Sequence, residues 1–332
     1  MRIDLAGWTR EATEMDHRAF LALFEEADRL GFDGVWFSEF HFHRPRIAYP
    51  SPHLLAAAIF ARTERLRVGT SILVLPLHHP LLLAEEICQL DHQSGGRIDV
   101  GIGRGTAPET FATVGIPLQA ARERFEAGFA LLRQALATGS AASHEGPWSF
   151  GETPVGPRPV QHPHPPIHVA GSTPETLGFA VANALPLLFS LEPPEGRQLA
   201  VLRDLAPEET LRPLLARSSL SRYVVIGPNR DAAAGLLDPL LAGLEERRRH
   251  FARQQGRSPV TVDRETLLAE RFLWGSPEDC TTAIRSLAAR TGIGALRCVF
   301  NGNGCLGPDA TLAAMRLFAR EVLPALKSPP GS

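Results

Sequence analysis

A carboxylate and two histidines lie close together near the start of the chain, where residues 38–43 read Ser-Glu-Phe-His-Phe-His. If this segment is extended, alternation along a strand places Glu39, His41 and His43 on one side, where they could share a pocket. A histidine that titrates near neutral pH can act as an acid, as a base, or as a donor to a developing oxyanion. A polar loop held by a salt bridge to a nearby arginine is the alternative. No further acidic cluster completes a metal site.

Two later segments could hold an anion or a flat ligand. Residues 101–105 read Gly-Ile-Gly-Arg-Gly, so a ligand can approach the backbone while Arg104 binds a phosphate or a carbonyl oxygen. Residues 171–175 read Gly-Ser-Thr-Pro-Glu, which favours a helix start capped by Thr173, with free N–H groups that could bind phosphate. Ordinary helix capping remains the alternative for this second segment.

Short apolar segments alternate with amphipathic stretches over most of the chain, as expected when crossover helices join parallel strands. The predicted strands are residues 1–7, Gly34–Ser38, Leu66–Leu75, Ile98–Gly103, Ile167–Ala170, Leu187–Ser190, Tyr223–Ile226 and Leu296–Phe300. Eight strands in a chain of this length favour an α/β fold, a (β/α)8 TIM barrel, over an open doubly wound sheet. The segments that could do chemistry then follow strands, on the face where barrels keep their active sites.

The extra length predicts insertions after strands 4 and 6, in residues 105–166 and 191–222. Both insertions would lie on the active-site face, because both follow strands. No internal repeat divides the chain, so we expect a single barrel domain over residues 1–326. Residues 327–332 are rich in proline and serine and are expected to form a disordered tail.

The composition limits the kinds of partner that we expect for this chain. The chain has 332 residues, 44% of them hydrophobic, and a formal net charge of −2, so no bias toward nucleic acid is expected. Its longest apolar run, Leu54–Ala61, is far shorter than the roughly 20 residues that cross a bilayer, so no membrane partner is expected. The four cysteines form no CxxC pair, which is typical of a reducing compartment. We therefore expect a soluble, cytoplasmic protein.

Several of these segments together resemble the bacterial-luciferase-like flavin-dependent monooxygenases. The resemblance lies in residues 31–42 (Gly-Phe-Asp-Gly-Val-Trp-Phe-Ser-Glu-Phe-His-Phe), in residues 67–76 (Arg-Val-Gly-Thr-Ser-Ile-Leu-Val-Leu-Pro), and in residues 90–105, which include Asp-His-Gln-Ser-Gly-Gly-Arg-Ile-Asp-Val-Gly. These motifs occur in the family's order, and the similarity extends from Leu5 to about Pro324.

The resemblance implies that reduced FMN (FMNH2) binds across the barrel mouth, over a cis peptide near Ser71 and Ile72. It assigns the FMN phosphate to Arg104 and to the turn formed by Gly171, Ser172 and Thr173, and it places Glu85 in the polar network beside the flavin. Glu39, His41 and His43 are the catalytic candidates, and His78 and His79 would shape the substrate side.

Two positions depart from luciferase. Phe40 stands where luciferase has its catalytic histidine, so a base would have to be His41, His43 or a water molecule. Gly103 stands where luciferase has a reactive cysteine, and its lack of a side chain predicts a larger substrate pocket. Light emission from an aldehyde is therefore not expected.

The family implies a two-component monooxygenase, in which FMNH2 and O2 form a flavin hydroperoxide that oxygenates a small, apolar organic substrate. Because no second dinucleotide site is visible in the sequence, a separate NAD(P)H:flavin reductase is expected, and the resemblance also implies a homodimer. Two alternatives stay open. One is an F420-dependent oxidoreductase of the same superfamily, and the other is a non-catalytic flavin-binding protein.

Overall fold

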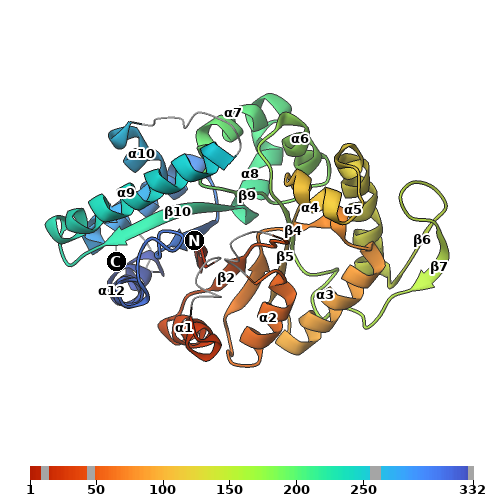
Figure 1. The fold of residues 1–332 in the computed structure, drawn as a ribbon, viewed down its shortest axis with the longest axis horizontal. Coiled ribbons are helices and arrows are strands. Elements are labelled where there is room, and N and C mark those ends of the chain that lie inside the picture. Colours follow the sequence, from red (N-terminus) through yellow and green to blue (C-terminus); the bar gives the residue numbers. More distant parts are fainter. Residues whose placement is uncertain (9–14, 43–48, 255–262, 328–332) are drawn as a thin grey trace.

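The structure, a computed structural model, describes residues 1–8, 15–42, 49–254 and 263–327. Within this part of the chain, parallel strands form one ten-stranded sheet that is surrounded by helices (Figure 1). The strands are β1 (Arg2–Leu5), β2 (Gly34–Phe37), β3 (Arg67–Thr70), β4 (Leu73–Val74), β5 (Ile98–Gly103), β8 (Ile167–Val169), β9 (Leu188–Phe189), β10 (Ser219–Ile226), β11 (Phe272–Gly275) and β12 (Ala295–Val299).

This sheet closes on itself. Hydrogen-bonded neighbours follow the order β10, β12, β1, β2, β3, β5 and β8, and β9 pairs with β10. A parallel bridge between Val169 and Leu187 joins β8 to the start of β9 and completes the ring. These eight strands confirm the (β/α)8 barrel predicted from the sequence. In addition, β4 pairs with β5 beyond the end of β3, and β11 pairs with the C-terminal half of β10.

Helices connect the strands and cover the outside of the barrel (Figure 1). They are α1 (His17–Leu30), α2 (Pro52–Phe60), α3 (Pro80–Ser94), α4 (Pro108–Thr113), α5 (Ala121–Thr138), α6 (Pro174–Ala182), α7 (Glu195–Leu205), α8 (Glu208–Arg217), α9 (Arg230–Gln254), α10 (Arg264–Arg271), α11 (Pro277–Thr291) and α12 (Pro308–Lys327). Local sequence sets their limits. In α1, the Asp16 side chain caps the first turn, and Gly31 ends the helix at a φ of 86°.

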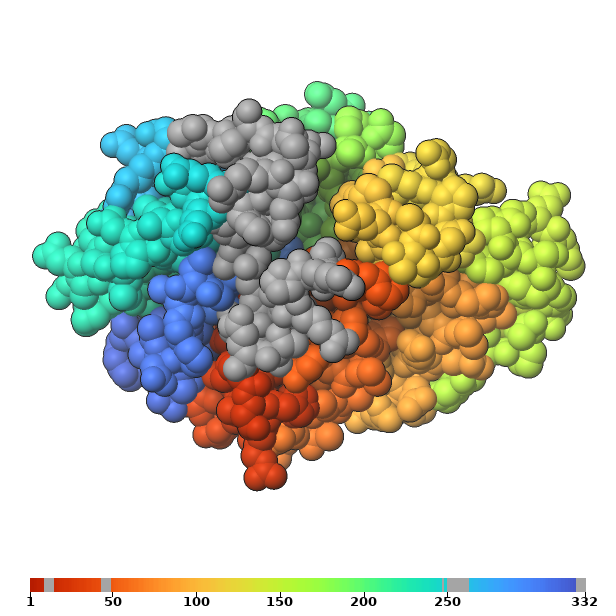
Figure 2. All heavy atoms as spheres, in the orientation of Figure 1, coloured from red at the N-terminus to blue at the C-terminus, as the bar shows by residue number. Residues whose placement is uncertain are grey.

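The connections differ in part from the predicted insertions. Residues 105–166 contain α4, α5 and an antiparallel hairpin of β6 (Ser140–Ser143) and β7 (Phe150–Pro154), which extends from the right of the barrel in Figure 1. In the space-filling view this hairpin and the yellow surface around α4 lie on the same side of the molecule (Figure 2).

Residues 191–222 hold α7 and α8, but the last four of these residues belong to β10, because that strand starts at Ser219 and is buried throughout. The longest connection instead follows β10, where α9, α10, β11 and α11 precede β12. Lys327 ends α12, and residues 328–332 of the predicted tail lie outside the described residues.

Alternation along the strands separates an apolar shell from a polar interior. On β1, β5 and β8 the residues Ile3, Val100 and Val169 belong to the hydrophobic core that packs under the helices. Their neighbours in sequence include buried Asp4, Asp99 and His168, and Gly101 and Gly103 lie at equivalent positions of β5. On these three strands the inside of the barrel therefore carries charged or polar side chains and glycines.

Candidate active site at the carboxyl ends of the strands

Glu39 is the centre of a polar cluster just beyond the end of β2. Its side chain is only 2% exposed. Its backbone N–H donates to the carbonyl of Ile72 at 3.1 Å, and the N–H of Val74 donates to its Oε2 at 2.5 Å. These bonds connect the end of β2 to Ile72 and to Val74 of β4, so the carboxylate has a fixed position at the mouth of the barrel.

Two histidines bind the other carboxylate oxygen of Glu39. The Nε2 atom of His41 lies 2.7 Å from Oε1, and the Nε2 atom of His78 lies 2.9 Å from the same oxygen. Both imidazoles remain partly exposed, at 30% and 25% of the side chain. The alternation that was used to group Glu39 with His41 therefore predicted a real contact. His43 lies outside the described residues.

Burial and pairing act in opposite directions on this cluster. Burial is the largest influence on Glu39 and raises its pKa, but the hydrogen bonds and charge of His78, with the bonds from His41 and Val74, lower the pKa below its usual value. Burial likewise lowers the pKa of His78, but Glu39 and the charge of Glu86 raise it above the usual value. The cluster therefore favours a carboxylate beside a protonated His78.

A second histidine–carboxylate contact lies next to the cluster. The Nδ1 atom of His53 on α2 is 3.0 Å from Oε2 of Glu86 on α3, and this hydrogen bond is the main cause of a lowered pKa at Glu86. Glu85 and Glu86 of α3 are both exposed, and the place of Glu85 beside the flavin stays a prediction. The charge of Glu86 interacts with both His78 and Glu39.

The Ser71–Ile72 peptide is cis, at the position expected from the family resemblance. Ser71 is held on several sides. Its N–H donates to the carbonyl of Phe37 at 2.6 Å, and its hydroxyl accepts from Nη1 of Arg297 at 2.7 Å. Arg297 is buried in the barrel, and burial lowers its pKa to about 10, partly offset by the charge of Asp4. It was not predicted as a site residue, because it follows an apolar strand start with no motif around it.

Gly103 does not leave open space beside this segment. A Cβ atom at this position would lie 2.4 Å from Cδ1 of Ile72, so the Ile72 side chain already fills the volume that a larger residue would take. The expectation that Gly103 enlarges the substrate pocket is therefore wrong. The glycine instead allows β5 to approach the cis segment closely.

Arg104 lies near enough to the start of α6 for its charge to act on Glu175, and the anion site expected there stays a prediction. Arg104 is exposed directly after β5, and the Thr173 side chain caps α6 by accepting from the N–H of Thr176 at 3.4 Å. The pKa of Glu175 in the first turn is lowered, mainly by its own backbone N–H and then by Thr173 and the charges of Arg122 and Arg104. Two guanidinium groups therefore lie near this helix start, and Arg122 was missed from the sequence because it lies in a different element.

Exposed aromatic side chains border the cluster. Phe40 and Phe42 are 41% and 62% exposed, although both are apolar. The carbonyl of His41, which lies between them, accepts from the Thr110 hydroxyl of α4 at 3.4 Å. The mouth of the barrel therefore combines a charged cluster with an apolar surface next to α4.

Comparison with known proteins agrees with this geometry. Residues 3–294 match the sequence model of the luciferase-like monooxygenase family. An uncharacterized protein, y4wF of Sinorhizobium fredii (strain NBRC 101917 / NGR234), is 39% identical over 163 residues, which cover 49% of this chain and 47% of that protein. The match therefore spans about half of each protein.

Two solved structures match over almost their whole length. The monooxygenase RslO1 from Streptomyces bottropensis is 26% identical with a TM-score of 0.80, and the match covers 98% of this chain and 99% of that chain. The oxygenating constituent of 3,6-diketocamphane monooxygenase from Pseudomonas putida, in complex with FMN, is 22% identical with a TM-score of 0.76 and 99% coverage of both chains. This chain belongs to the luciferase-like monooxygenase family, which confirms the resemblance inferred from its motifs.

Proposed function

We propose that this protein is the oxygenase component of a two-component FMN-dependent monooxygenase. Reduced FMN and O2 would be its cosubstrates, and a small apolar organic compound would receive one oxygen atom. The observation that carries this proposal is the bonding of the Glu39 cluster to the Ser71–Val74 segment at the carboxyl ends of the barrel strands. The FMN complex of the similar diketocamphane enzyme supports the choice of cofactor.

The residues at the barrel mouth fit a flavin phosphate at one end. The N-terminus of α6 offers the exposed hydroxyls of Ser172 and Thr173. The charges of Arg104 and Arg122 act at the same helix start. A helix N-terminus next to two cations is a favourable environment for a dianionic phosphate. Gly171, after β8, and Arg104, after the neighbouring strand β5, would hold it, as the family resemblance implies.

The other end fits the ring. Gly103 lets β5 approach the Ser71–Ile72 segment closely, and a flat group over these strands would pack against the Ile72 side chain that covers Gly103. Reduced FMN supplies the two electrons that divide O2 into the transferred oxygen atom and a water molecule.

The chain's own contribution to the chemistry is proton control at the Glu39 cluster. His41 shares the Glu39 carboxylate with His78 and is partly exposed toward the mouth, so its imidazole can donate a proton to an oxygen atom there. His78 keeps a proton on Nε2, because Glu39 raises its pKa. Glu39 would then act as the positioning residue for both rings.

The apolar surface at the mouth supports an apolar substrate. Phe40 cannot exchange a proton, but Phe40 and Phe42 together offer exposed aromatic area beside His41. A substrate that packs against these rings would exclude water from the reacting oxygen. Excluding water in this way would keep the activated oxygen from being released as hydrogen peroxide.

The partners follow from the same proposal. A separate NAD(P)H:flavin reductase would supply FMNH2, and the relative described as an oxygenating constituent supports a divided system. A homodimer would bury the exposed side chains of Leu54 on α2 and Leu82 on α3. A single barrel domain and a cytoplasmic location belong to the same proposal. Among the described residues, no helix is long and apolar enough to cross a membrane.

The test is oxygen transfer from labelled O2. The protein is mixed with chemically reduced FMN and 18O2 in the presence of apolar ketones, aldehydes and aromatic compounds, and the products are analysed by mass spectrometry. We expect one 18O atom in the product, without any reductase when FMNH2 is supplied. Reduced F420 in place of FMNH2 is the parallel arm. Conversion with F420 but not with FMNH2 would contradict the proposal, as would oxidation of FMNH2 that labels no compound.

A further inference from the structure

The side chain of Arg297 crosses the inside of the barrel. Its backbone lies on β12, level with Asp4 of β1 and Ser221 of β10. Its guanidinium donates to the hydroxyl of Ser71, which follows β3, at 2.7 Å, and to the carbonyl of Phe189 on β9 at 2.6 Å. Around the ring, β3 is three strands away from β12 on one side, and β9 is two strands away on the other. The guanidinium therefore lies inside the barrel, directly below the segment that contains Ser71.

This cation has no carboxylate partner. Arg297 is 3% exposed, and its Nε atom is buried with no hydrogen-bond partner among the described residues. Arg2, in the same barrel, is different, because it binds both Asp4 and Asp99 at 2.7 Å. The indole N–H of Trp36 donates to the other oxygen of Asp4 at 2.7 Å. Cζ of each arginine lies 5.8 Å from the centre of the Trp36 ring, so a paired and an unpaired cation border the same indole.

A buried charge without an opposite charge is unfavourable, and this one is kept. Burial lowers the pKa of Arg297 to about 10, partly offset by the charge of Asp4, so the guanidinium still carries its proton near neutral pH. The carbonyl and the hydroxyl that it binds supply only partial negative charge. The inside of the barrel therefore holds a positive charge that no carboxylate of the described ranges pairs with, and an anion at the mouth would compensate it.

Ser71 connects this charge to the mouth of the barrel. Its backbone groups are both bonded, since its N–H donates to the carbonyl of Phe37 at 2.6 Å and its carbonyl accepts from the hydroxyl of Ser38 at 2.6 Å. Its side-chain oxygen accepts from Arg297, so the hydroxyl hydrogen points away from the guanidinium. Within residues 1–8, 15–42, 49–254 and 263–327, this hydrogen has no acceptor. Ser71 is partly exposed, and a hydroxyl that accepts from a cation is a stronger donor.

We propose that Arg297, acting through the hydroxyl of Ser71, stabilises the negative charge on the ring of reduced FMN. Arg297 is then the positioning residue for this hydroxyl, and the inference rests on the proposed function, because it needs the flavin ring beside Ser71. Reduced flavin loses a ring proton near neutral pH, whereas the oxidised ring is neutral, so a fixed positive charge favours the reduced form. In a buried environment of low dielectric constant, a charge acts on the ring without direct contact.

The reduction potential of bound FMN tests this proposal. The full chain is saturated with FMN and titrated anaerobically against a reference dye, and fluorescence quenching gives the affinity for oxidised FMN. Arg297→Gln keeps an N–H donor for Ser71 but removes the charge. We expect it to weaken reduced FMN about tenfold more than oxidised FMN, which lowers the potential by about 30 mV. Arg297→Lys keeps the charge and should stay near the wild-type potential.

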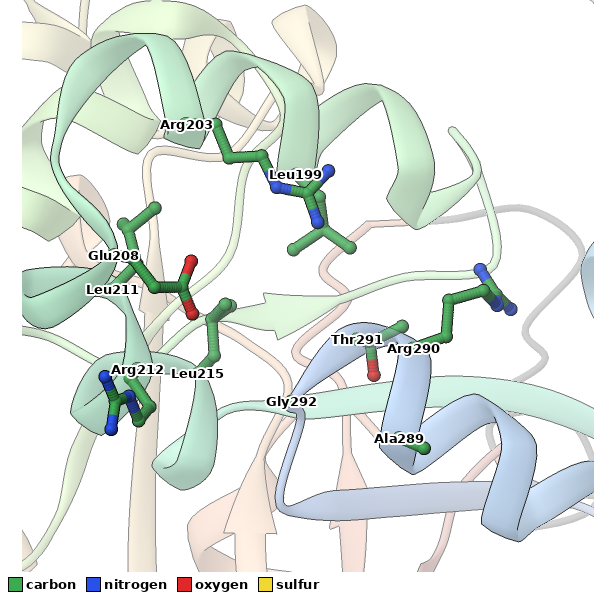
Figure 3. A pocket seen from close by; sticks show the side chains of 10 residues that line it. All are labelled: Leu199, Arg203, Glu208, Leu211, Arg212, Leu215, Ala289, Arg290, Thr291 and Gly292. Carbon is green, nitrogen blue, oxygen red and sulfur yellow. The ribbon is translucent and has the colours of Figure 1, made fainter.

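Arg212→Gln is the control for net charge. Arg212 is an exposed residue of α8 and lines a separate cavity of about 150 Å³ between α7, α8 and α11 (Figure 3). This variant should keep the wild-type potential, and thermal unfolding of every variant checks that the fold is intact. Equal potentials in wild type and Arg297→Gln, or an equal loss in Arg297→Gln and Arg297→Lys, would overturn the proposal.

Ser71→Ala tests the path of the effect. It should lower the potential in the same direction as Arg297→Gln, and the double variant should be no lower than the lower of the two single variants, because both act through one hydroxyl. Additive losses would contradict the path through Ser71. The proposed function fails differently. Wild-type protein that binds neither form of FMN would refute both proposals, whereas the expected potentials without oxygen transfer would refute only the proposed function.

Discussion

At the scale of single residues, the charge of His78 depends on the Glu39 carboxylate. The pKa of His78 is raised in the folded protein, so its contribution to folding is complete below the pKa of histidine in the unfolded chain and is lost as pH rises through the folded-state value. The pKa of Glu39 is lowered, so its contribution is present above its unfolded-state pKa and is lost as pH falls through the folded-state value. The pair therefore stabilises the fold most between about pH 4.3 and 6.5.

Replacing Glu39 by glutamine should reveal this pH window. We expect Glu39→Gln to lower the free energy of unfolding by about 1–3 kcal/mol within the window and by less on either side of it. Urea titrations at stepped pH measure the difference. Glu145→Gln serves as the control, since Glu145 is exposed. A difference that does not vary with pH would show that the charge of His78 is independent of Glu39.

Arg104 should matter for cofactor binding rather than for folding. Because its side chain is exposed and its charge acts at the start of α6, Arg104→Ala should weaken FMN binding about tenfold or more while the melting temperature changes little. Fluorescence quenching of FMN measures the affinity. The same measurement on Arg18→Ala, an exposed arginine of α1, should give the wild-type value. Equal loss in both variants would indicate a nonspecific effect of net charge.

At the scale of elements, β5 packs against β3 and β4 with very little space. A Cβ atom at Gly101 would lie 2.0 Å from the carbonyl oxygen of Thr70, which belongs to the backbone and cannot turn away. At Gly103 the nearest atom is Cδ1 of Ile72, the end of a side chain that can change rotamer. Two glycines on the same strand therefore differ in how they tolerate a methyl group.

The matched pair Gly101→Ala and Gly103→Ala tests this difference. We expect Gly101→Ala to destabilise the protein by about 3 kcal/mol or more, and Gly103→Ala by about 1 kcal/mol. Chemical denaturation gives both values. If a clash with Ile72 causes the smaller effect, Gly103→Ala combined with Ile72→Val should recover most of it. An equal loss in the two single variants would contradict the close approach of β5 to the Thr70 carbonyl.

The elements of the barrel were largely predictable, because each barrel strand is a short apolar run between turn residues. β11 was missed, because Phe272–Gly275 has only four residues and lies between two helices. Its parallel pairing with β10 can be recognised only once the position of β10 is known. The site was predictable only where its residues are close in sequence. Alternation grouped Glu39 with His41. His78, which lies just before α3, and Glu86, which lies on α3, also interact with the Glu39 carboxylate. A single sequence contains no distances between elements, so these two residues could not be grouped with Glu39 in advance.

At the scale of the whole molecule, the number of paired residues differs between neighbouring strands of the barrel. β1 and β12 share four register pairs, and β10 and β12 share five. Between β8 and β9 there is one bridge, Val169 to Leu187, and β9 itself has two residues. Few ladder hydrogen bonds at one position of a closed sheet make local opening easiest there.

Hydrogen exchange should show this position directly. The amide of Val169 donates to the carbonyl of Pro186 at 2.9 Å, and the amide of Val68 donates to the carbonyl of Arg97 at 3.0 Å. Both residues are fully buried, so solvent exposure does not distinguish them. We expect Val169 to exchange faster than Val68 under native conditions, measured by NMR. Equal protection would mean that the ring opens only by global unfolding.

The paired charges of Arg2, Asp4 and Asp99, together with the indole of Trp36, form a partition across the barrel. The Glu39 cluster lies beyond one side of it, and a cavity of about 580 Å³ at the amino ends of β1, β8, β10 and β12 lies on the other. Loops at the carboxyl face can therefore be exchanged to change the reaction without altering the amino-end cavity, and the cavity can be reshaped without reaching the chemistry. For protein engineering, one scaffold offers two compartments that can be modified separately.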